Sequence, residues 1–135
     1  MHRPSIATIA VLFVLTTGIG LGAHHSVPVN FDQSKEVTVT GVIKQIRWVN
    51  PHSQWLLEVT GDDGKTVEWL VEFGAVNTMK RAGFPMERFK FGDTVAVTGY
   101  PGRRDRAVLL RYVVHDGVRL NPEMRPNDAS PAAAN

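Results

Sequence analysis

Residues 37–59 constrain the fold most strongly, because they predict two antiparallel strands joined by a tight corner. Valine alternates with threonine in residues 37–40, which is the period-2 pattern of a half-buried strand. Gly41 follows, and a glycine where the apolar phase changes predicts a β-bulge or a sharp coil of the strand, which lets one long strand serve two sides of a closed barrel. The apolar residues of the new phase are Val42, Ile46 and Trp48. Pro51 ends the strand at the corner.

The remaining elements complete a barrel pattern. Strands are predicted over residues 36–49, 54–60, 66–73, 94–99 and 107–114. An Asp-Gly hairpin signal lies at residues 61–64, and apolar residues at helical spacing predict one short helix over 74–82, ended by Gly83. An immunoglobulin-like sandwich needs about seven strands and has no place for this helix. The chain is therefore predicted to be mainly β, a small five-stranded OB-fold-like barrel over 35–120 with one short helix between strands three and four.

The first 23 residues are predicted to be a signal peptide. They carry a short basic start, an apolar run over residues 6–15 and a tail of small residues. A membrane anchor and a buried helix are the alternatives, but the unbroken apolar run is well short of the roughly 20 residues that span a bilayer. We therefore expect a periplasmic or secreted protein without a membrane span after cleavage. Residues 24–34 then form an N-terminal arm, and residues 121–135 a disordered tail.

Composition narrows the chemistry of the exported chain. It has no cysteine, which excludes disulfides, thiolate nucleophiles and cysteine-based zinc or iron–sulfur sites. Loss of residues 1–23 removes Arg3 and no acidic residue, so the formal charge falls from +2 to +1. So small a charge is no argument for a nucleic-acid partner, and none is expected.

Several motifs together resemble an uncharacterised family of exported bacterial proteins, domain of unknown function 6152, over about residues 23–120. The motifs are Ala23-His24-His25-Ser26, Phe31-Asp32, Gly41-x-Ile43, Trp48-x-Asn50-Pro51-His52, Trp69-x-Val71-Glu72, Asn77 with Arg81 and Gly83, and Gly92-Asp93-x-Val95-x-Val97-x-Gly99. Phe84 stands where the family has Trp, and Ala75-Val76 where it more often has Ser-Pro. The resemblance implies a small exported β-barrel with no established activity, and it supplies no catalytic residues.

Three histidines are the candidate metal ligands: His24, His25 and His52. Cleavage after Ala23 would make His24 the first residue, whose amine and imidazole can chelate one metal. Cleavage after Gly22 would instead place the amine, two backbone amides and the His25 imidazole in a square-planar set suited to Cu(II). For His52 to close the site, the arm must fold back over the barrel. The alternative is a solvated His-His pair, and the metal is left open between copper and others.

The other polar residues have structural interpretations. His52 can be a turn histidine that hydrogen-bonds backbone beside a capping Asn50. His115 precedes an Asp-Gly turn and is expected at the surface. Side chains alternate between the two faces of a strand, and Trp55 and Trp69 alternate in phase with the apolar residues of their strands. They are therefore predicted to lie in the core rather than on a base-stacking surface. The position of Trp48 is undecided, and Glu68 and Glu72 are predicted on a solvated face.

These observations favour a non-catalytic exported binding module that holds a metal ion, copper or another, or a small ligand through His24, His25 and His52. The alternative is a structural or interaction domain that docks another envelope protein without a ligand. No nucleophile elbow, phosphate loop or zinc-protease motif occurs in the sequence, so we do not expect an enzyme.

Overall fold

The computed structural model describes residues 27–104, 106–122 and 130–131. Its elements run in the order α2 (Val27–Asn30), β1 (Val37–Arg47), β2 (Gln54–Thr60), β3 (Thr66–Glu72), α3 (Val76–Ala82), the 3-10 turn η1 (Met86–Arg88), β4 (Thr94–Pro101), β5 (Ala107–His115), β6 (Val118–Leu120) and β7 (Ser130–Pro131). None of the helices in these ranges is long and apolar enough to cross a membrane.

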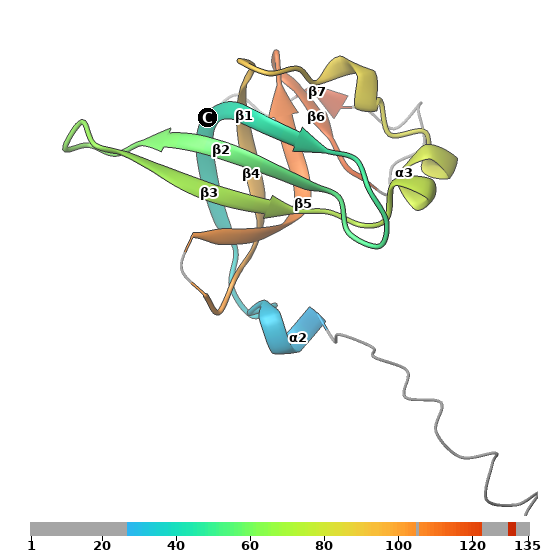
Figure 1. The fold of residues 1–135 in the computed structure, drawn as a ribbon, viewed down its shortest axis with the longest axis horizontal. Helices are drawn as coiled ribbons and strands as arrows, with labels where there is room; N and C mark the ends of the chain where they lie inside the picture. The colour runs from blue at the N-terminus through green and yellow to red at the C-terminus, as the bar shows by residue number, and fades with distance from the viewer. Residues whose placement is uncertain (1–26, 105, 123–129, 132–135) are drawn as a thin grey trace, which may run out of the picture.

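Strand pairing confirms the predicted barrel. The sheet runs β3-β2-β1-β4-β5, and a parallel pairing between β3 and β5 closes it (Figure 1). Five strands in this order, with a helix between the third and fourth, form the OB fold. The short strands β6 and β7 extend the sheet beyond β5. Because β7 pairs with β6, part of the segment predicted as a disordered tail is a strand.

The long first strand bends, but not where the sequence predicted. Strand β1 pairs with β4 through Val37–Val42 and with β2 through Val42–Arg47, and its register shifts between Ile43 and Gln45 rather than at Gly41. As a result Ile43 is fully buried and Val42 only half-buried, which corrects the predicted parity. Gly41 has a different role, since a Cβ there would lie 2.7 Å from the Glu58 carbonyl oxygen.

The barrel interior is rich in aromatic rings. Trp55 and Phe73 are buried with their ring centroids 4.5 Å apart, and Trp48 packs edge-on against both. Trp55 is therefore in the core as predicted, whereas Trp69 and Trp48 are only partly buried against it. Helix α3 lies at one end of the barrel, inserts Met79 into this core, and ends at Gly83 in the left-handed conformation, as predicted (Figure 1).

His115 is buried, contrary to the predicted surface position. Its side chain is 8% exposed, and its Nε2 lies 3.4 Å from Asp93 Oδ2 and 3.6 Å from Asp116 Oδ2. The turn needs positive φ only at Asp116 and Gly117, so His115 stays in β5 and pairs with Val118. The Phe89 ring, 5.3 Å away between centroids, packs against the imidazole.

Candidate functional site

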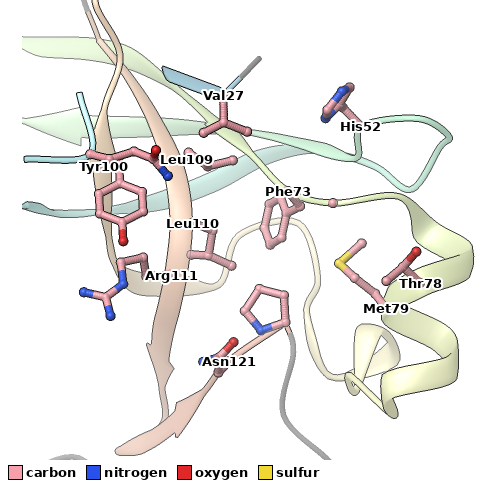
Figure 2. Close-up of a pocket in the computed structure, with 13 residues that line it drawn as sticks. Val27, His52, Phe73, Thr78, Met79, Tyr100, Leu109, Leu110, Arg111 and Asn121 are labelled. Atoms are coloured by element: carbon pink, nitrogen blue, oxygen red, sulfur yellow. The ribbon is translucent and has the colours of Figure 1, made fainter. Parts of the chain in front are cut away.

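A pocket of about 550 Å³ opens between the end of β3, helix α3 and β5. Its floor is apolar, formed by Phe73, Met79 and Leu110 (Figure 2). His52 lies at one end of the pocket, and Arg111 lies beside Tyr100 at the other (Figure 2). The volume falls within the range of roughly 300–1,000 Å³ that is usual for small-ligand sites.

His52 lies next to a carboxylate. Its Nδ1 lies 3.2 Å from Glu72 Oε1, and the two side chains are 44% and 22% exposed. When Nδ1–H donates to Glu72, the Nε2 atom keeps a free lone pair and can bind a metal or a proton donor. Glu72 is thus not the solvated residue that the sequence predicted. His52 is paired with the side chain of Glu72, whereas the sequence analysis suggested a backbone partner for His52.

The corner that carries His52 is held by buried hydrogen bonds. The Ser53 side chain is fully buried, and its hydroxyl accepts from Val49 N at 3.1 Å and donates to Val49 O at 3.0 Å. The backbone of Ser53 bonds to Phe73 and Gly74. These contacts fix the end of β3 against the corner, and the first residue of β2, Gln54, pairs with Glu72. The His52–Glu72 pair is therefore built on a rigid frame.

Ser53→Ala should destabilise the domain by about 1–3 kcal/mol, because the N–H of Val49 would lose its Ser53 partner and the C=O of Val49 would keep only the bond from the Val76 N–H. Urea unfolding followed by circular dichroism measures the change in the free energy of unfolding. Ser34→Ala is the control, since Ser34 is exposed and its hydroxyl bonds only to Asp32 two residues away; this variant should cost less than about 0.5 kcal/mol. Equal costs for the two variants would contradict this account of the corner.

The described part of the N-terminal arm is docked on the barrel. Phe31 is buried and bridges to Gly102, and Arg103 Nε donates to the Pro28 carbonyl at 3.1 Å. This brings Val27, the first residue of α2, to the rim of the pocket that His52 also lines (Figure 2). The sequence predicted an arm over residues 24–34 without a helix, and the short helix α2 within it was not foreseen.

The turn after α2 is fixed by Asp32. The hydroxyl of Ser34, and then its backbone N–H, hold the pKa of this carboxyl below its ordinary value by hydrogen bonding to the charged form. The turn precedes β1 and places Gln33 at the pocket. The Asp32 N–H also donates to the Pro101 carbonyl at 2.9 Å, which attaches this turn to β4.

The end of the pocket opposite His52 was not foreseen from the sequence. Arg111 Nη1 lies 3.0 Å from Glu36 Oε2, and the guanidinium carbon of Arg111 lies 5.4 Å from the centre of the Tyr100 ring. The three residues come from β5, the approach to β1, and β4. Only the pairing of β4 with both β1 and β5 brings them together, so no local sequence signal identifies them.

The described residues supply one of the three predicted metal ligands. His52 lies at the pocket, whereas His24 and His25 lie outside the described residues. Across residues 27–104, 106–122 and 130–131, no cluster of three or more His, Asp or Glu side chains is arranged to hold a metal ion. Metal binding stays a prediction that depends on the arm.

In sequence, residues 12–110 match the family described as "Family of unknown function (DUF6152)". No curated protein matches the chain. Among solved structures, the dimeric N-terminal domain of PriB from Thermoanaerobacter tencongensis is 16% identical, with a TM-score of 0.46 over 61% of this chain and 96% of that one. The small single-stranded DNA-binding protein from Streptomyces coelicolor is 18% identical, with a TM-score of 0.42 over 61% and 92%. The fold assignment stands on the strand order described above.

Proposed function

We propose that this chain, which belongs to the family of unknown function DUF6152, is an exported, non-catalytic binding module whose pocket rim holds a metal ion. Copper is the metal that the predicted donors suit best. The ligands in this proposal are His52, with the imidazoles and the terminal amine contributed by His24 and His25. We assign no reaction to the site.

The observation that carries the proposal is the close approach of the Glu72 carboxylate to one ring nitrogen of His52. A histidine that binds a metal through one ring nitrogen commonly donates its other N–H to a carboxylate, which sets the tautomer and makes the ligand more basic. Glu72 stands in that position, 3.2 Å from Nδ1. The nitrogen left for the metal is Nε2, on a side chain that is 44% exposed and thus open to an incoming ligand.

The arm supports the proposal by its attachment. Val27 and His52 line the same pocket. Consecutive Cα atoms are at most 3.8 Å apart, so covalent geometry keeps the Cα of His25 within about 7.6 Å of the Cα of Val27. The metal site needs the arm to return to the barrel, and the arm lies on the barrel from Val27 onward. The apolar pocket beside Val27 has room for a small ligand.

A nucleic-acid partner is not part of the proposal. OB folds bind oligonucleotides on the outer face of strands β2 and β3, commonly by base stacking. In this chain Trp55 is fully buried, and Trp69 is partly buried and packs against the core. The outward positions include Glu58 and Glu68, which oppose phosphate.

Calorimetric titration of Cu(II) and Zn(II) into the mature protein with its native N-terminus tests the proposal. We expect one-to-one copper binding that weakens at least about tenfold in His52→Ala and about 10–100-fold in Glu72→Gln, because the second variant loses the orienting carboxylate. Glu68→Gln is the matched control on the same strand and should bind as the parent does. Intact-mass analysis must show a free amine at residue 23 or 24.

Two outcomes would overturn the proposal. Absence of copper binding to the mature protein would remove the metal function altogether. Binding that is unchanged in His52→Ala but lost in His24→Ala/His25→Ala would confine the metal to the arm and leave the His52–Glu72 pair without the assigned role.

A further inference from the structure

Strand β3 has a free edge. It pairs with β2 along its whole length, from Thr66 to Glu72, but with β5 only through Leu70–Glu72. In the part of the chain that the structure describes, nothing pairs with the other side of residues 66–69. Figure 1 shows this stretch on the outer side of the β2–β3 hairpin, which extends beyond the barrel.

The backbone groups at this edge face outward. The N–H of Leu70 donates to the Arg106 carbonyl at 2.8 Å, so the polar groups of Leu70 point toward β5. Backbone direction alternates along a strand. The N–H and C=O of Thr66 and of Glu68 therefore point the same way, where β5 is not present. They are ready to pair with another extended strand.

Charges flank the free edge with opposite signs. The hairpin tip at residues 61–64 carries Asp62 and Asp63. The loop at residues 102–106, next to the start of β5, carries three arginines and one aspartate. Asp63 forms an exposed ion pair with Lys65, in which Oδ2 of Asp63 lies 3.7 Å from Nζ of Lys65. Among the described residues no ion pair involves Asp62, Arg104 or Arg106.

We propose that two copies of this chain associate through this edge, with their β3 strands antiparallel about a two-fold axis. Centred on Val67, the pairing sets Thr66 of each copy opposite Glu68 of the other, and all the free edge groups find partners. Because the strands are antiparallel, the acidic tip of each hairpin meets the basic loop of the other copy. A two-fold interface requires such self-complementarity, and this edge has it.

The surface beside the free edge of β3 can accommodate the hairpin of a second copy. A shallow hollow of about 460 Å³ is lined by Leu56, Thr66, Val67, Glu68, Leu70 and Arg106. The second hairpin would cover it and remove half-buried apolar side chains from water. The proposal is independent of the metal site, because His52 lies at the opposite end of β3.

Reversing the charges at each end of the interface by substitution is the decisive test. Analytical ultracentrifugation of the mature, metal-free protein should show a dimer that dissociates as salt is raised. Asp62→Lys/Asp63→Lys and Arg104→Glu/Arg106→Glu should each be monomeric alone, with dimerisation weakened at least tenfold, because like charges then meet twice in the dimer. An equimolar mixture of the two variants should form the dimer again, because opposite charges then meet at both ends.

The backbone contribution has its own variant. Glu68→Pro removes an N–H that points to the free edge and not to β2, so the barrel should fold, as circular dichroism checks, while the dimer is lost. Glu68→Gln keeps the N–H and should remain dimeric. A wild-type chain that is monomeric at about 100 μM, a mixture that stays monomeric, or a dimer that persists in Glu68→Pro would overturn the proposal.

Discussion

Gly99→Ala should destabilise the barrel by at least about 3 kcal/mol or prevent it from folding. A Cβ at this position would overlap the Leu109 carbonyl oxygen and lie 2.8 Å from the Leu109 carbonyl carbon. Both atoms belong to the backbone of the neighbouring strand β5. A flexible side chain could move aside, but these atoms can shift only if β4 and β5 separate where their register changes.

Gly74→Ala is the matched control for that result. Gly74 lies just after β3, no atom lies within 4 Å of the position that a Cβ would take, and its φ is not in the left-handed region. We expect the free energy of unfolding to change by less than about 0.5 kcal/mol. Urea unfolding followed by circular dichroism compares the two variants. A Gly99→Ala protein as stable as Gly74→Ala would show that the strands approach less closely than described.

Trp55→Ala should cost about 3–5 kcal/mol, the usual range for a large aromatic residue removed from a core. Trp55 is fully buried, with its ring 4.5 Å from Phe73 and 4.7 Å from Phe89, centroid to centroid. It joins the aromatic rings that follow β1, β3 and the η1 segment, which cannot close over a gap of that size. The cavity would therefore persist in the folded protein.

Trp55→Phe should cost much less, about 1.5 kcal/mol or below. The indole Nε1 of Trp55 is buried and has no hydrogen-bond partner among the described residues. Phenylalanine keeps most of the ring contacts and omits this N–H, so the lost volume is partly offset by the removal of an unpaired donor. Thermal and urea unfolding measure both variants. Equal losses for Phe and Ala would mean that the indole N–H contributes to stability after all.

Local patterns in the sequence were sufficient for the barrel itself. Alternation at residues 37–40, the hairpin signal at 61–64 and the stop at Gly83 are each set by neighbours a few residues away. The same patterns gave wrong predictions where packing between strands determines the position or burial of a residue. The bend of β1 depends on which residue faces β2 and which faces β4, and so it lies after Ile43 rather than at Gly41. His115 is buried because Phe89 and Asp93, more than 20 residues earlier in the chain, lie against its ring.

Some residues of the candidate site can likewise be found from local sequence, and others only from the folded structure. Histidines near the start of the expected mature chain and at the corner before β2 can be found from local sequence, because their presence there needs no partner. The position of Glu72 opposite His52, and the reach of Val27 to the same pocket, follow from the folded barrel instead. These residues are far apart in sequence or on different elements, and they meet because strand pairing and the docking of Phe31 fix their positions.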